Sequence, residues 1–198
     1  MMSRSLTTAI AVATTSLLLA SPALAHAGPG IVGGFTSGFV HPVLGWDHVV
    51  AMVAVGIWGA FLGKPGIWVL PVVFPLVMAV GALLGFMGIA FPAVEAGIAS
   101  SAIVLGLLIV FMVRPPVWIA GIVVAFFALF HGHAHGAELP AAANAVAYGV
   151  GFVLATGLLH LCGIGFGTLG NSRAENIVIR IGGGAITVVG AVFLTGAV

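Results

Sequence analysis

Long apolar runs, separated by short polar or Pro/Gly-containing breaks, dominate the chain. Beyond residue 25, six of these runs are long enough to cross a hydrocarbon core of ~30 Å as α-helices. They cover residues 41–62, 66–88, 93–113, 117–135, 140–163 and 176–197. The pattern therefore predicts an all-α fold, a polytopic membrane helical bundle with six transmembrane helices.

The first 25 residues follow a different pattern. Arg4 precedes an apolar run, and Pro22 and the small residues up to Ala25 follow it. A charged start, an apolar centre and small residues before a cleavage point are typical of a secretory signal peptide. We expect residues 1–25 to be a cleaved signal peptide and residues 26–198 to form one transmembrane domain; an uncleaved first helix is the alternative.

The composition agrees with a membrane protein. Hydrophobic residues make up 62% of the chain and charged residues only 5%, whereas about a quarter of the residues of soluble domains are charged. With five Lys and Arg residues in total, the chain has no basic surface for nucleic acid. The single Cys162 can form neither an internal disulfide nor a multi-thiolate metal site.

The few charges predict the orientation in the membrane. If cleavage leaves the new N-terminus outside the cytoplasm, the loops alternate and every cation of the mature chain falls on the inner side, as the positive-inside rule requires. These cations are Lys64, Arg114, Arg173 and Arg180. We therefore expect a multi-pass protein of the bacterial inner membrane with both termini in the periplasm.

Three acids fall in the outer half of the predicted bundle: Asp47, Glu95 and Glu138. Each charged side chain at mid-membrane costs about 2.5–3.5 kcal/mol. No cation is predicted on their side, so their partners must be neutral histidines, a protonated histidine or a bound cation.

The stretch from His41 to His48 contains the first group of polar residues. Pro42 suits the first turn of a helix, which predicts His41 at the helix cap and Asp47 and His48 about two turns further, with His41 and His48 nearly on one face. Two imidazoles and a carboxylate match the ligand preference of nickel, cobalt and zinc ions. A buried His–Asp hydrogen bond between helices is the alternative. We interpret Met52, further along this face, as a packing residue.

The second group contains His131, His133, His135 and Glu138. If a helix continues through it, His131, His135 and Glu138 share a face and His133 points away; if the backbone is extended, the three histidines point the same way. Gly132 and Gly136 make a break in the helix plausible. A His-rich outer loop that collects metal weakly, or binds it incidentally, is a third interpretation.

Two further histidines stand apart from these groups. His160 lies in the inner part of the fifth apolar run, where a hydrogen bond between helices and an inner way-station for a metal are both open interpretations. His26 would follow the cleavage point, where it is either an outer metal ligand or part of a flexible terminus.

These motifs together resemble the HupE/UreJ family of bacterial membrane proteins. The resemblance rests on the segments His41-Pro-Val-Leu-Gly-Trp-Asp-His48, His131 to Glu138 and Ala155-Thr-Gly-Leu-Leu-His160, with Met52, Val55-Gly56 and Glu95. It runs from the signal peptide to the last apolar run. Five residues separate His41 from Asp47, whereas the broader nickel/cobalt transporters have four, so their coordination geometry does not transfer directly.

The resemblance implies a secondary permease for nickel, or for cobalt, that serves hydrogenase or urease maturation or cobalamin synthesis. It implies a transporter and no enzyme, with transported Ni²⁺ or Co²⁺ as substrate and no permanently bound cofactor. A homo-oligomer is compatible with it. The residues expected to handle the metal are His41, Asp47, His48, Glu95, His131, His135 and Glu138, with His133 as a further candidate.

Two other functional classes use the same residues. In an intramembrane zinc-dependent hydrolase, His41, His131 and His135 would hold zinc while Asp47 or a Glu activates water. In a cytochrome, two histidines would ligate haem, although the acids among the histidines argue against it. The chain has no phosphate-binding loop for ATP hydrolysis, so a permease would use the membrane potential. Nickel and cobalt stay open, because similar N/O sites bind both.

Overall fold

All secondary structure of the described chain is helical, as predicted. The computed structural model describes residues 34–139, 144–169 and 173–196, with side chains from residue 176 in the last segment. The proposed signal peptide, residues 1–25, and His26 lie outside the described residues. The helices are α2 (Phe35–Leu44), α3 (Trp46–Leu62), α4 (Gly66–Phe86), α5 (Val94–Val110), α6 (Val117–Glu138), α7 (Ala145–Gly167) and α8 (Arg173–Leu194).

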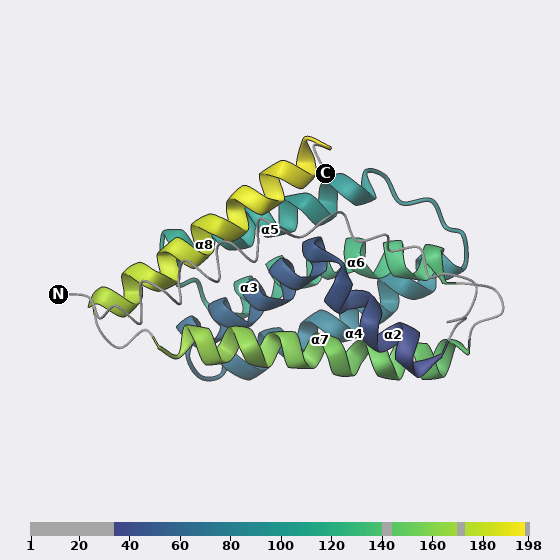
Figure 1. The fold of residues 1–198 in the computed structure, drawn as a ribbon, viewed down its shortest axis with the longest axis horizontal. Helices are drawn as coiled ribbons and strands as arrows, with labels where there is room; N and C mark the ends of the chain where they lie inside the picture. The colour runs from purple at the N-terminus through teal and green to yellow at the C-terminus, as the bar shows by residue number, and fades with distance from the viewer. Residues whose placement is uncertain (1–33, 140–143, 170–172, 197–198) are drawn as a thin grey trace.

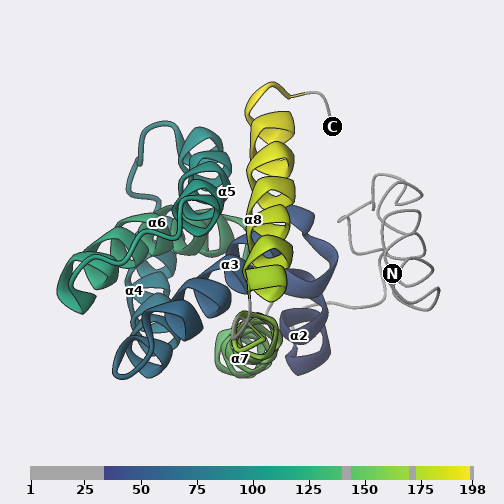
Figure 2. The ribbon, with the colours of Figure 1, turned by 90° about the vertical axis from the view of Figure 1, so that its left-hand side faces the viewer.

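Helix α3 is the centre of the bundle and contacts every other described helix. In Figures 1 and 2, α5 and α8 lie side by side above the remaining helices, and α2 and α7 lie together below. The third closely packed pair is α4 with α6. Because α3 is surrounded, ten of its 17 residues are buried.

The sequence of α3 explains this central position. Apolar side chains occur on all sides of the helix, and a helix that is hydrophobic all round is buried. Ala51, Met52, Val55, Ile57 and Trp58 are each at most 1% exposed. The interpretation of Met52 as a packing residue is therefore confirmed.

Glycines let the paired helices approach closely. A Cβ at Gly56 of α3 would meet the backbone of α7 at Gly163, and a Cβ at Gly106 of α5 would meet that of α8 at Gly183. Small residues at helix interfaces are typical of membrane bundles, where close packing drives association. The pairings also show that α3 and α7 run in the same direction while α5 and α8 are antiparallel.

Four helices are long and apolar enough to span a membrane: α4, α6, α7 and residues 176–194 of α8. Helices α2 and α3 pass the same test only as a pair, and they are bent by 82°. Helix α5 is apolar but has 17 residues. The structure therefore supports a multi-pass membrane protein, while the count of six spans stays a prediction.

The prediction of one straight helix over residues 41–62 was wrong. His41 and Pro42 lie inside α2, and the backbone of Gly45 leaves the helical region with φ −81° and ψ 104° before α3 begins at Trp46. Pro42 has no N–H, so the hydrogen bonds of α2 are already weakened when the chain reaches Gly45. His41 and His48 therefore do not share a helix face.

Charges are segregated between the two ends of the bundle. Lys64 and Arg114 lie in the connections that follow α3 and α5, and the Arg114 guanidinium packs 4.1 Å from the centre of the Phe61 ring at the end of α3. Asp47 begins α3 and Glu138 ends α6, at the opposite end. This agrees with the expected separation of acids from cations.

Candidate metal centre

Three helix ends bring the histidines together. The end of α2 supplies His41, the first turn of α3 supplies Asp47 and His48, and the last two turns of α6 supply His131 and His135. Because α3 begins immediately after the bend, its first turn faces the last turns of α6. Residues that are some ninety positions apart in the sequence thus become neighbours.

His48 is the hub of this cluster and is 5% exposed. Its Nδ1 lies 3.1 Å from Oδ1 of Asp47. On the other side of the ring, Nε2 lies 3.1 Å from Nδ1 of His131 and also contacts Nε2 of His135. The ring centres of His48 and His135 are 4.2 Å apart. Two imidazoles from α6 therefore meet the same nitrogen of His48.

Ser101 of α5 orients His131, which is fully buried. The Ser101 hydroxyl donates to the Ile98 carbonyl at 2.6 Å and lies 2.9 Å from Nε2 of His131. A serine has one hydroxyl hydrogen. Since that hydrogen is given to Ile98, the oxygen accepts from Nε2–H of His131, and neutral His131 presents the lone pair of Nδ1 to His48.

The same argument applies to His48. The carboxylate of Asp47 can only accept, so Nδ1 of His48 carries the hydrogen between them. Neutral His48 then has a lone pair on Nε2, facing the lone pair on Nδ1 of His131. Two facing lone pairs repel each other, and a metal ion bound beside them would relieve this repulsion.

A second group of possible ligands adjoins the first. His41, His135 and Glu138 each offer one ligand atom, and the three atoms lie within 4.8 Å of one another. Nε2 of His41 is 3.8 Å from Oε2 of Glu138, and the two side chains are 29% and 62% exposed. His135 belongs to both groups. The partly exposed group of His41 and Glu138 therefore adjoins the buried group around His48.

The helical interpretation of the His131–Glu138 segment is confirmed, because α6 continues through Glu138. His133 points away from the cluster, donates from Nε2 to the Ile89 carbonyl at 2.8 Å and stacks on Phe91. The predicted break and the outer His-rich loop were both wrong. Gly132 and Gly136 instead let α6 pack against the backbone of α4 at Met78 and Ala82.

Glu95 is not gathered into either group. It is exposed in the first turn of α5 and makes no hydrogen bond or ion pair with any described residue. Its negative charge and that of Glu138 repel each other, so both contribute to the negative potential at this end of the protein. The zinc set of the hydrolase alternative is also not assembled within the described segments, where His41 groups with His135 and Glu138 and not with His131.

Within the described residues, His160 of α7 makes no hydrogen bond between helices, which was one of its two predicted roles. It is 1% exposed, and neither ring nitrogen has a hydrogen-bond partner among the described residues. The hydroxyl of Thr156, one turn earlier on the same helix face, is also fully buried and unpartnered there. An unsatisfied buried polar group costs about 1–3 kcal/mol, so this pair requires an explanation.

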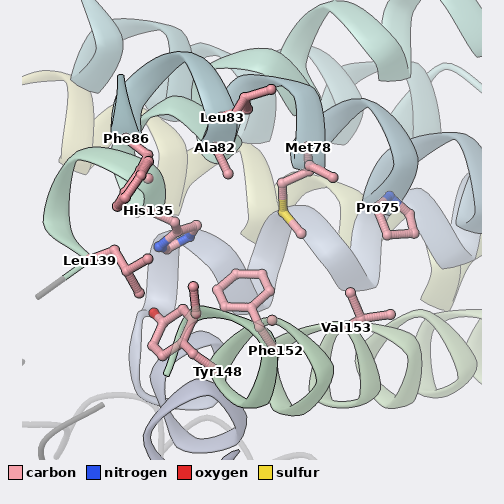
Figure 3. A pocket seen from close by; sticks show the side chains of 14 residues that line it. Pro75, Met78, Ala82, Leu83, Phe86, His135, Leu139, Tyr148, Phe152 and Val153 are labelled. Atoms are coloured by element: carbon pink, nitrogen blue, oxygen red, sulfur yellow. The ribbon is translucent and has the colours of Figure 1, made fainter. Parts of the chain in front are cut away.

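A largely apolar cavity of about 420 Å³ adjoins the centre. Met78, Ala82 and Leu83 of α4 line one side, and Tyr148, Phe152 and Val153 of α7 line the other. Figure 3 shows His135 between these two walls. The Phe152 ring lies 4.5 Å from that of His135, centre to centre, so an apolar ring covers one side of His135.

Three residues of this region were missed by the sequence analysis. Ser101 orients His131, and Tyr148 and Phe152 pack their rings against His41. A serine in an apolar span and the only tyrosine of the chain were the available signals. Neither indicates a partner without the tertiary structure.

Comparison with known proteins agrees with the motifs. The chain matches the sequence model of the HupE / UreJ protein family over residues 13–193. It is 47% identical over 186 residues to Protein HupE of Rhizobium leguminosarum bv. viciae, an alignment that covers 93% of this chain and 97% of that protein. No solved structure matches the chain. The resemblance seen in the motifs is therefore confirmed, and the chain belongs to the HupE/UreJ family.

Proposed function

We propose that this protein is a secondary transporter that imports a divalent transition-metal ion, nickel first and cobalt next, across the bacterial inner membrane. The observation that carries the proposal is the meeting of Nε2 of His48 with ring nitrogens of His131 and His135 beside the Asp47 carboxylate. Imidazole and carboxylate ligands suit nickel and cobalt. Membership of the HupE/UreJ family supports the same function.

The order of the ligands supports capture followed by dehydration. His41 and Glu138 are partly exposed, and His135 links them to the buried His48 and His131. A hydrated ion first meets a carboxylate and an imidazole at the surface. It then exchanges water for buried nitrogens, while Asp47 and Glu138 compensate its double charge.

The proposed topology has six spans, with α2 and α3 together as the first. Helix α5 meets the lower length limit of about 17 residues. With Lys64 and Arg114 in the cytoplasm under the positive-inside rule, the candidate centre faces the periplasm. Cleavage of residues 1–25 would place both ends of the mature chain there as well.

The membrane potential is sufficient to drive uptake. Each elementary charge gains ~2.3 kcal/mol per 100 mV, so a dication gains about 4.6 kcal/mol. That free energy corresponds to an accumulation of about a thousandfold. No ATP hydrolysis and no coupling ion are required for uptake of a scarce metal.

The test is uptake of radioactive nickel and cobalt into cells that lack other importers of these metals. We expect the wild-type chain to accumulate nickel, and Asp47→Asn and His135→Ala to lower the uptake rate by about tenfold or more. His133→Ala is the matched control, because it removes a histidine two positions away on the opposite face of α6. It should retain at least half of the wild-type rate.

Absence of nickel and cobalt accumulation by correctly inserted wild-type protein would refute transport. Equal uptake by the His135→Ala variant and the wild-type chain would refute the ligand assignment. Purified protein that retains one stoichiometric zinc ion and hydrolyses lipid amides would instead favour the hydrolase.

A further inference from the structure

Two buried polar groups outside the candidate metal centre have no partner among the described residues. They are the imidazole of His160 and the hydroxyl of Thr156. Both lie on α7, four residues apart, and therefore on the same face of the helix. Both side chains are at most 1% exposed. Three polar atoms thus converge on one region of an otherwise apolar core.

This region is connected to the candidate metal centre through one aromatic ring. Phe74 of α4 is fully buried, and its ring centre lies 5.6 Å from that of His131 and 5.6 Å from that of His160. His160 lies about 12 Å further along α7 than Phe152, the residue that packs on His135. Phe74 therefore separates the histidines of the centre from a deeper histidine in the bundle.

The chemistry of the deeper pair differs from that of the centre. A neutral imidazole offers a nitrogen lone pair, and a threonine hydroxyl offers an oxygen. No carboxylate of the described chain contacts either group. A divalent transition metal would be held there weakly and would keep part of its water shell, because only two protein ligands are available.

We propose that His160 and Thr156 form a second, transient site for a partly hydrated divalent transition-metal cation, which reaches it from the centre by passing Phe74. This inference rests on the proposed transport function. The carboxylates make the first site the tighter one, and the neutral second site allows release toward the far side of the membrane. Conduction requires such weaker sites after the point of capture.

The experiment compares full-length wild-type protein with His160→Leu, which fills a similar volume without a ligand atom. We expect the maximal rate of nickel uptake to fall about tenfold, while the Kd of the purified variant for Ni²⁺ stays within about twofold of wild type. Its thermal unfolding midpoint should not fall, because an unsatisfied buried polar group has been replaced by an apolar one. His133→Leu, the same substitution outside the pathway, should transport at nearly the wild-type rate.

A wild-type uptake rate in His160→Leu overturns the second site and indicates a pair that holds only water. If His160→Leu does not insert or fold, the same uptake and binding measurements are made on Thr156→Val, since valine preserves the shape of threonine. A reduced maximal rate with an unchanged Kd in Thr156→Val supports the site, and a wild-type rate overturns it. When the wild-type chain itself accumulates neither nickel nor cobalt, the proposed function fails and the second site fails with it.

Discussion

Ser101 and His131 form a buried hydrogen bond in which the serine is the acceptor. The hydroxyl oxygen lies 2.9 Å from Nε2 of His131, and its own hydrogen goes to the Ile98 carbonyl at 2.6 Å. This bond fixes the neutral tautomer of His131 and directs Nδ1 toward His48. A hydroxyl on α5 thus sets the chemistry of a cluster formed mainly by α3 and α6.

Ser101→Ala should weaken nickel binding by about tenfold, the lower end of the range for loss of a group that orients a metal ligand. The variant loses the acceptor that holds the hydrogen on Nε2, so His131 no longer presents Nδ1 consistently. Isothermal titration of purified full-length protein measures the effect. Ser100→Ala, at the neighbouring position, should bind within about twofold of wild type. Equal affinities of the two variants would show that Ser101 does not orient His131.

Gly136→Ala should destabilise the protein by at least ~1–3 kcal/mol. A Cβ at Gly136 would overlap the backbone of α4 at Ala82, so α4 and α6 would have to separate. Gly121→Ala is the control in the same helix, where a Cβ has nothing within 4 Å. That variant should be as stable as wild type or slightly more so. Thermal unfolding in detergent compares them, and matching midpoints would contradict the close packing.

Gly45→Ala should lower metal affinity while leaving the fold intact. The φ and ψ angles of Gly45 are accessible to alanine, but its Cβ would lie 3.0 Å from Oδ1 of Asp47 and 3.4 Å from Nδ1 of His48. The methyl group therefore presses on the Asp47–His48 pair. We expect a rise in Kd for nickel of about three- to tenfold, corresponding to ~0.7–1.4 kcal/mol. An unchanged Kd would mean that the pair shifts without cost.

His41 and Glu138 should behave as a coupled pair. Their side chains lie 3.8 Å apart and group with His135, so each substitution weakens the same contact with the ion. We expect His41→Ala and Glu138→Gln each to raise the half-saturating nickel concentration, and the double variant to be less impaired than the product of the two effects. Strict additivity in a double-mutant uptake cycle would show that the two residues act at separate places.

Once the segment is helical, periodicity accounts for part of the candidate site. The i, i+4, i+7 spacing predicted that His131, His135 and Glu138 share a face and that His133 does not, and α6 has this arrangement. The opposite locations of acids and cations also followed from the order of apolar runs and charges. Both depend on local helix geometry and on chain order, which the sequence contains directly.

The bend at Gly45 could not be read from the same pattern. Pro42 suits the first turn of a helix as well as a later position, and Gly45 tolerates helical and extended backbone alike. The contacts of α2 with α7 and of α3 with α6 select the bent form. The consequence is large, because the bend transfers His41 from the face of His48 to the neighbourhood of His135 and Glu138.

By itself, the sequence determined that the chain forms apolar helices, that its acids and histidines concentrate toward one end, and that it belongs with HupE/UreJ proteins. Only the tertiary structure decided that His48 meets His131 and His135, that Ser101 sets a tautomer, and that His160 and Thr156 lie behind Phe74 with no partner among the described residues. The physical reason is that the spacing of residues along one helix determines only the face on which each side chain lies. Which residue of another helix a side chain meets depends on how the helices pack. In this protein, close contacts at glycines and the bend at Gly45 determine that packing.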